Sequence, residues 1–472
     1  MKRNFVKKLF SAVLIGAMTM SLVTGCGSSQ LAEKKDASDK TTEKKVEVSL
    51  SSTNYEFEKE FFYSNYNENS NADEDRQDGI DTFEDNDIVF ETVSYQELTN
   101  LFQQEGDYMI LLGGSWCHRS RAAIDYINKY AKEYGINKIY QFDYNMDGVN
   151  TNTTIRTSNG TDGDTYNFLY GELCERYLTN VNDWVAFKPG NENAITWTNL
   201  QGQDVVTGRT QVPFIFIYNK DNTQDNSGNN ATDGTTKFPI VYAFEEMVER
   251  DSEGVYPSLQ EYEVDENGKQ IREYMTDEYL GRLKVIFDFF KDNNMKQGEY
   301  TDADYVKDVF PGVFSDDEQI NLHVINYLQL TWLMKQEGES LILFGGAWDD
   351  ATTKNIKAVN DYAVKNDVTV YWFDPAIDGY VGENEYGYDR APMIMDESSP
   401  LVSMYKDLAD TYLVNLESDT QVDGAPALTL PCLMSYNKDA KGDDGFVAPI
   451  TAYSNDESGI ENVFETYAAA TK

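Results

Sequence analysis

The chain has 472 residues and a formal net charge of −42, from 81 acidic side chains against 39 Lys and Arg. Such acidity argues against nucleic acid or an anionic membrane face as a partner, because like charges repel within a Debye length. It indicates a solvated acidic surface in the first place, and divalent cations or basic peptides as the other partners that such a charge can attract.

The first 25 residues predict an export signal. An apolar run covers 9–23 and follows four basic residues, Lys2, Arg3, Lys7 and Lys8. The next motif, Val23-Thr24-Gly25-Cys26, resembles the lipobox of bacterial lipoproteins. This resemblance implies cleavage before Cys26 and a lipid on that cysteine as the only membrane link, on the outer face of the cytoplasmic membrane. An uncleaved anchor is less favoured, since the run is shorter than the roughly 20 residues a span needs.

Two further segments precede the expected domains. Residues 26–52 are rich in Ser, Lys, Thr, Asp and Glu and predict a disordered tether, because they cannot bury enough apolar surface to fold. Residues 53–87 are acidic and aromatic with little periodicity, so we expect an irregular lead-in. The remaining chain is long enough for two domains, which we place at 88–300 and 301–472.

The chain repeats itself at a constant shift of 232 positions, the difference between 349 and 117. Residues 98–117 match residues 330–349, and a repeat of this length implies a duplicated domain. The copies differ at their last position, where Cys117 of the first copy corresponds to Asp349 of the second. One copy therefore has a thiol at this place and the other cannot.

Both copies predict the same order of elements. Each begins with a helix start that carries a cap residue, at Ser94 and at Asn326. An apolar strand then ends at a Gly-Gly pair, and a helix with one apolar face follows. The predicted strands are 108–112 and 340–344.

The second half of each copy predicts a strand that ends in an acid, a helix, and a hairpin. The strands are 139–143 and 370–374, the helices are 173–181 and 408–416, and the hairpins begin at Pro213 and Pro431. Proline suits the first residue of a strand, where a ladder can spare an amide. A strand-helix-strand unit joined to an antiparallel hairpin predicts an α/β fold, with a mixed sheet covered by helices.

These residues resemble the thioredoxin fold. The marks are a strand that leads to Trp116-Cys117-His118-Arg119-Ser120 at a helix start, and a downstream strand-opening proline in Val212-Pro213. The resemblance implies that this proline is cis and faces the cysteine, with Trp116, Val212 and Pro213 in a substrate groove. We therefore predict two tandem thioredoxin-like domains, each a mixed sheet flanked by helices.

The sequence departs from that family in three respects. The second cysteine of the family motif is replaced by Ser120, and the buried acid that in thioredoxins lies six residues before the nucleophile falls on Leu111. The second copy has no thiol at either motif position. We expect a degenerate second site there, formed by Trp348, Asp349, Leu430 and Pro431.

The predicted chemistry centres on Cys117. A thiolate at a helix N-terminus is favoured by unpaired amides and by the helix dipole, and His118 and Arg119 add positive character. Since Ser120 cannot resolve a mixed disulfide, we expect monothiol exchange with a protein or peptide thiol or disulfide, resolved by a second thiol from substrate or partner. The catalytic residues would be Cys117, His118 and Ser120, although His118 is equally well explained as a solvated helix-start residue.

Other candidate sites are weaker. Cys174 and Cys432 lie at apolar positions and are expected to be buried. Residues 143–148 match the first half of a calcium-binding loop, but Thr154 stands where a bidentate Glu is needed. Turn chemistry explains the same residues, so we expect no metal and no cofactor.

Two functions remain open. The first is a surface-anchored thiol-disulfide protein whose first domain is active. The second is a non-catalytic lipoprotein that binds a peptide or another envelope protein, because the proline groove of this fold can accept an extended strand by main-chain pairing.

Overall fold

The computed structural model describes residues 52–68, 87–148, 153–161, 166–245, 260–264, 266, 270–377, 379, 381–383, 389–390 and 393–471. The predicted signal, Cys26 and the tether up to residue 51 lie outside these residues. All elements described below belong to one compact unit, Val46–Lys472. None of the helices in the described ranges is both long and apolar enough to cross a membrane.

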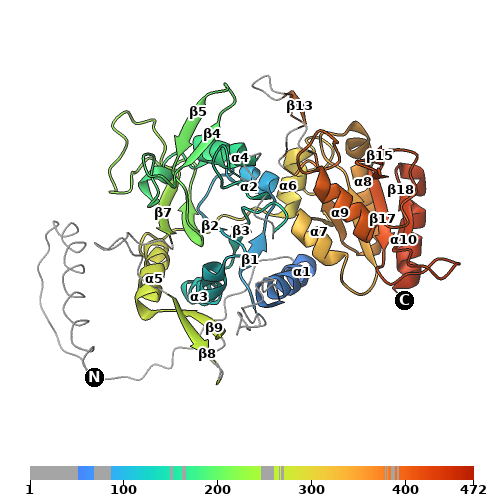
Figure 1. The fold of residues 1–472 in the computed structure, drawn as a ribbon, viewed down its shortest axis with the longest axis horizontal. Coiled ribbons are helices and arrows are strands. Elements are labelled where there is room, and N and C mark those ends of the chain that lie inside the picture. Colours follow the sequence, from blue (N-terminus) through green and yellow to red (C-terminus); the bar gives the residue numbers. More distant parts are fainter. Residues whose placement is uncertain are drawn as a thin grey trace, which may run out of the picture. The chain divides into compact units, whose positions relative to one another are not determined.

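The first copy forms a five-stranded mixed sheet within the described residues, in the order β1-β3-β2-β6-β7 (Figure 1). Strands β1, β3 and β2 are parallel, whereas β6 and β7 are antiparallel to their neighbours. Strands β2 and β6 are buried at all five positions, as central strands covered on both faces should be. The bounds are β1 Phe90–Thr92, β2 Tyr108–Leu112, β3 Ile139–Phe142, β6 Phe214–Tyr218 and β7 Ile240–Glu245.

Helices accompany this sheet at the predicted places. The capping box at Ser94 is present, with Glu97 returning the hydrogen bond, and it opens α2. The helix expected at 173–181 begins earlier, as α4, and continues as a π-helix, η4. The bounds are α2 Tyr95–Leu101, α3 His118–Tyr134, α4 Asn167–Glu172, η4 Leu173–Tyr177, the 3-10 turn η5 Val181–Asp183 and α5 Asp277–Asp292; two hairpins join β4 Ile195–Thr198 to β5 Asp204–Thr207 and β8 Gln260–Val264 to β9 Gln270–Met275.

The second copy repeats the sheet, in the order β10-β12-β11-β17-β18 and with the same directions. The prediction of two thioredoxin-like α/β domains is therefore confirmed by the strand order and pairing. The strands of this sheet are β10 Leu322–Val324, β11 Ser340–Phe344, β12 Val370–Phe373, β17 Cys432–Tyr436 and β18 Ile450–Ser454. The helices are α6 Asp302–Val309, α7 Tyr327–Leu333, α8 Asp350–Asn366, α9 Val402–Tyr412 and α10 Glu457–Ala470. Two short hairpins pair β13 Gly382–Glu383 with β14 Asp389–Arg390, and β15 Gln421–Val422 with β16 Ala425–Pro426.

The expected irregular lead-in at 53–87 is wrong where the structure describes it. Helix α1 covers Ser52–Tyr63 and a π-helix, η1, covers Ser64–Glu68, while residues 69–86 lie outside the described residues. The phenylalanine side chains of α1 are buried: the Phe62 ring stacks on the Phe90 ring at 4.8 Å, and the Phe57 ring lies 4.8 Å from the Tyr371 ring. Burial against both domains stabilises this helix, and such tertiary packing leaves little periodic signal in the sequence.

The two domains contact each other through equivalent surfaces. The Gln96 side chain donates to the Ala376 carbonyl and covers Gly379, where an added Cβ would lie 3.1 Å from Gln96 Cγ. In the reciprocal contact, Leu328 covers Gly148, where an added Cβ would lie 2.3 Å from Leu328 Cδ2. Leu328 is the repeat counterpart of Gln96, and each glycine follows an Asp after the corresponding strand. The interface is thus isologous, like that of a two-fold dimer.

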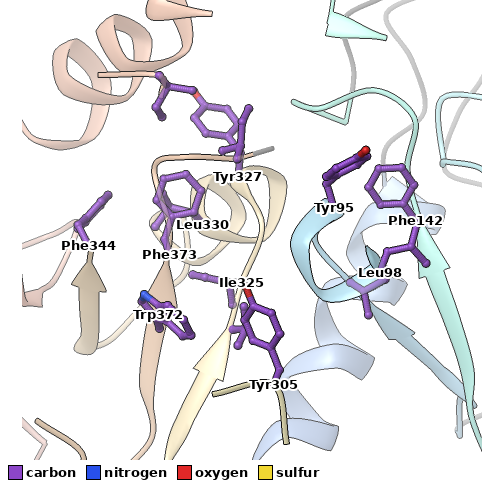
Figure 2. Close-up of a cluster of buried hydrophobic side chains, with 14 of the residues drawn as sticks. Tyr95, Leu98, Phe142, Tyr305, Ile325, Tyr327, Leu330, Phe344, Trp372 and Phe373 are labelled. Carbon is purple, nitrogen blue, oxygen red and sulfur yellow. The ribbon is translucent and has the colours of Figure 1, made fainter. Parts of the chain in front are cut away.

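The aromatic core of the interface follows the same symmetry. Tyr95 lies 6.1 Å from Phe142 in the first domain, and Tyr327 lies 6.3 Å from Phe373 in the second. Figure 2 shows these pairs on either side of the interface.

A buried charge cluster joins α1 to both domains. Glu58 is 0 % exposed; its Oε2 accepts from the Thr92 amide at 3.1 Å and its Oε1 from Gln329 Nε2 at 2.7 Å. His323 lies between two acids, with Nε2 3.3 Å from Glu58 Oε1 and Nδ1 2.7 Å from Asp302 Oδ2. Burial alone would lower the pKa of His323, but Asp302 and Glu58 outweigh it and raise that pKa to about 10. His323 is therefore protonated at neutral pH, where it lies between the two acids.

Candidate functional site

Cys117 is the N-cap residue of α3, with extended backbone (φ −87°, ψ 115°) and no capping hydrogen bond from its side chain. The thiol is partly exposed, and its Sγ–H donates to the Val212 carbonyl at 3.7 Å. The Val212-Pro213 peptide bond is cis. The proline loop therefore lies against the cysteine, as the resemblance implied.

A buried tryptophan-aspartate pair lies beside the thiol. Trp116 Nε1 donates to Asp143 Oδ1 at 2.7 Å, and the Asn145 amide donates to the same oxygen at 2.9 Å. Asp143 Oδ2 is buried and has no hydrogen-bond partner among the described residues. Burial raises the pKa of Asp143 to about 7, although both hydrogen bonds lower it. A buried acid therefore lies at the end of β3, the strand next to β2, on which Leu111 lies.

Gly114 is required for this pair. A Cβ at this position would lie 2.0 Å from Asp143 Oδ2 and 2.4 Å from Trp116 Nε1, distances that side-chain atoms do not tolerate. The second glycine of the Gly-Gly pair therefore leaves the space in which the indole and the carboxyl group meet.

The lead-in segment also contributes to the site, which the sequence did not predict. Ser115 Oγ donates to Asn65 Oδ1 at 2.8 Å, and Arg121 Nη1 donates to the Ser115 carbonyl at 2.5 Å. Tyr66 is 1 % exposed, and burial, with Asp143 and Cys117 nearby, raises the pKa of its hydroxyl well above the ordinary value. Residues of η1 thus pack next to the segment that carries the thiol.

Of the other predicted catalytic residues, the structure describes the side chain of Ser120 but only the backbone of His118. Ser120 is 2 % exposed, and its Oγ has no hydrogen-bond partner among the described residues. It lies near Gly113, where an added Cβ would be 3.0 Å from Ser120 Oγ. The backbone of His118 begins α3, but its side chain lies outside the described part of the chain, so its role stays a prediction.

The second copy has the same framework without a thiol. Trp348 Nε1 donates to Asp374 Oδ1 at 2.8 Å, burial raises the pKa of Asp374 to about 7, and the Leu430-Pro431 bond is cis. Asp349 is the N-cap of α8 and accepts from the Thr352 amide at 2.7 Å and from Thr352 Oγ1 at 2.6 Å. Where the first copy presents a sulfur, the second uses a carboxylate to cap its helix.

The remaining described cysteines, Cys174 and Cys432, are buried, as predicted. Burial raises the pKa of each thiol to about 12, so both stay protonated and unreactive at neutral pH. Cys117 is therefore the accessible thiol among the described residues.

The acidic side chains after β3 form hydrogen bonds within the protein. Asp143 holds Trp116, and Asp147 accepts from Thr153 Oγ1 at 2.6 Å. Within the described ranges, no group of three or more His, Cys, Asp or Glu side chains is placed to hold a metal ion.

No family model matches the chain, and no curated protein matches its sequence. Among solved structures, it is similar to ERdj5 in crystal form II, with 9 % identity over 79 % of this chain and 28 % of that chain and a TM-score of 0.17. It is also similar to the zinc-bound form of human ERp44, with 7 % identity over 61 % of this chain and 48 % of that chain and a TM-score of 0.16. The chain spans less than half the length of either protein.

The strand order and the geometry of the site define the class of protein. The chain contains two thioredoxin-like domains, of which the first has a partly exposed cysteine at the motif position and the second has Asp349 there.

Proposed function

We propose that the protein is a monothiol thiol-disulfide exchange protein that acts outside the cytoplasmic membrane, where a lipid on Cys26 anchors it. The observation that carries this proposal is the setting of Cys117. Its thiol is partly exposed at the start of a 17-residue helix and makes no capping hydrogen bond to that helix. It contacts the Val212 carbonyl, which precedes a cis-proline. The anchor and the location are supported by the sequence of residues 1–26 alone.

The reaction needs no second cysteine in the protein. The Cys117 thiolate attacks one sulfur of a substrate disulfide; a new S–S bond forms, the old one breaks, and the leaving sulfur departs as a thiolate that takes up a proton. A second thiol, from the substrate or from a small thiol, then attacks the mixed disulfide and releases Cys117. When the second thiol belongs to the substrate, the disulfide is rearranged with no net redox change; when it is a small thiol such as glutathione, that thiol is oxidised to a disulfide as the substrate disulfide is reduced.

The surroundings of Cys117 favour exchange over net oxidation. Ser120 occupies the buried position where a resolving thiol would lie, so an intramolecular disulfide cannot form there. The proline loop brings main chain next to the sulfur at the Val212 carbonyl, which suits an extended peptide disulfide as the substrate.

The test is turnover of a glutathionylated peptide by the purified protein with free glutathione present. We expect turnover that is lost in Cys117→Ser and kept in the double variant Cys174→Ala, Cys432→Ala. Turnover that survives Cys117→Ser would contradict the proposal, as would alkylation of Cys117 no faster than that of the two buried cysteines.

The second copy favours a second candidate, a non-catalytic binding protein. It keeps the cis-proline and the tryptophan-aspartate pair although it has no thiol, so these features persist without redox chemistry. A pull-down of envelope proteins that was unchanged after disruption of both proline loops would argue against this candidate.

A further inference from the structure

Helix α1 contacts both domains along its length. Figure 1 shows it beside β1 of the first domain and α7 of the second. Its Phe62 ring stacks on Phe90 of β1, and its Phe61 ring meets Trp332 of α7 edge-on at 5.7 Å. At about 1.5 Å per residue, the 12 residues of α1 span about 18 Å. The helix can therefore connect a contact in the second domain with the functional site of the first.

The second domain holds the middle of α1 through buried side chains. The Phe57 ring packs edge-on against the His323 ring at 4.8 Å. Glu58 Oε1 accepts from Gln329 Nε2 at 2.7 Å and lies 3.3 Å from His323 Nε2. On the other edge of the imidazole, Asp302 Oδ2 lies 2.7 Å from Nδ1. His323 is thus fixed on both edges while it contacts two residues of α1.

The segment that follows α1 reaches the functional site of the first domain. The π-helix η1 begins at the residue after α1 ends. Asn65 Oδ1 of η1 accepts from Ser115 Oγ at 2.8 Å, two positions before Cys117, and both side chains of this hydrogen bond are buried. Tyr66 is buried as well, and Cys117 contributes to the raised pKa of its hydroxyl, as a close neighbour does. One continuous segment therefore joins the His323 contact to the residues that precede the thiol.

We propose that the second domain, which has no thiol at its own motif position, positions the Cys117 segment of the first domain through α1. His323 is a positioning residue that holds the helix, and Asn65 passes its placement to Ser115. Packed side chains and hydrogen bonds on a rigid helix carry such coupling, because a close-packed interior does not absorb a displacement locally. The inference does not use the exchange reaction, so it stands or falls independently of that proposal.

The test is the rate at which iodoacetamide alkylates Cys117 in the full chain between pH 6 and 9, followed by peptide mass spectrometry. His323→Gln should loosen α1 and η1 from Ser115, so that water and reagent reach the thiol segment more often. We expect alkylation at pH 7 to be at least about threefold faster than in the wild type. The midpoint of the pH profile should also lie at lower pH than in the wild type, since water favours the thiolate.

Two variants separate positioning from a general loss of stability. Phe57→Leu removes the ring contact with His323 and keeps a large apolar side chain, so it should act in the same direction in a folded protein. Leu408→Ala removes a fully buried side chain from α9, which makes none of the contacts with α1 described above. It destabilises the second domain but should leave the alkylation of Cys117 unchanged. Circular dichroism identifies a variant that does not fold.

A double-mutant cycle tests whether the effect passes through η1. Asn65→Ala should itself speed alkylation, and adding His323→Gln should then change the rate by less than about twofold, because the contact with Ser115 is already lost. Effects of the two substitutions that multiply would overturn the proposal. So would unchanged alkylation in both His323→Gln and Phe57→Leu, or an effect of Leu408→Ala as large as that of His323→Gln.

Discussion

The buried carboxyl group of Asp143 should make the protein less stable as pH rises, and Asp143→Asn should remove that dependence. Asparagine has the same shape, and its amide oxygen can still accept from Trp116 Nε1, which donates to Asp143 Oδ1 at 2.7 Å. It can never ionise. At low pH, where Asp143 is protonated, the two side chains are nearly equivalent.

The magnitude follows from the pKa, which burial raises from its ordinary value of 3.8 to about 7. Below pH 3.8 the carboxyl group of Asp143 is protonated in both the folded and the unfolded protein, so it does not lower the free energy of unfolding. Between pH 3.8 and 7 the folded protein holds a proton that the unfolded chain has released, so stability falls as pH rises; above 7 the full cost applies. At about 1.4 kcal/mol per tenfold in proton affinity, this cost is at most about 4 kcal/mol.

The assay is urea unfolding of the wild type and of Asp143→Asn at pH 4, 6 and 8. We expect the two free energies of unfolding to agree at pH 4, and the variant to be more stable by about 1–4 kcal/mol at pH 8. Asp419→Asn, which removes an exposed carboxylate, should show no such gain. A difference between Asp143→Asn and wild type that stays constant from pH 4 to 8, or that is larger at pH 4, would refute the reasoning.

Three further substitutions test other parts of the structure. Ser120→Cys places a second thiol at the buried motif position and should form a disulfide with Cys117 on oxidation, measured as the loss of two titratable thiols. If both thiols persisted after oxidation, the expected proximity of residues 117 and 120 would be wrong. His323→Gln removes the cation between Glu58 and Asp302 and should lower the free energy of unfolding by about 3–5 kcal/mol at pH 7. Since the pKa of His323 is raised from 6.5 to about 10, its stabilising contribution is complete below pH 6.5, and the difference between variant and wild type should narrow as pH rises toward 10. Gly114→Ala should displace the indole of Trp116 and change the tryptophan fluorescence. Gly281→Ala, where a Cβ meets nothing within 4 Å, should be neutral or stabilise α5 by up to about 1 kcal/mol. Equal changes in fluorescence and stability for the two variants would contradict the steric argument.

The sheets could be predicted from the sequence because the repeat supplies each pattern twice. An apolar strand that ends in Gly-Gly and a second strand that ends in Asp recur in the same order, and local periodicity is enough to read them. Helix α1 could not be predicted, because its buried aromatic residues contact two domains that the sequence shows only as separate segments. Phe57, for example, packs against Tyr371, more than 300 positions away.

The candidate site was predicted in part. Cys117, its helix and the proline loop were expected, but the pairing of Trp116 with Asp143 was not. A signal for it was present: both copies keep the second glycine, the tryptophan and the acid, while the cysteine changes. The copies share the buried tryptophan-aspartate pair and the glycine that leaves space for it. The sequence alone does not show this contact, because the tryptophan and the aspartate lie on different elements.

Reaction with oxidised glutathione tests the exchange chemistry of Cys117 most directly. The reduced, folded protein would be mixed with oxidised glutathione, and the adduct located by peptide mass spectrometry. We expect one glutathione on Cys117, released again by free glutathione, and none on Cys174 or Cys432 until the protein is unfolded. No adduct on Cys117, or an equal distribution over the three cysteines, would contradict a reactive thiol at the start of α3.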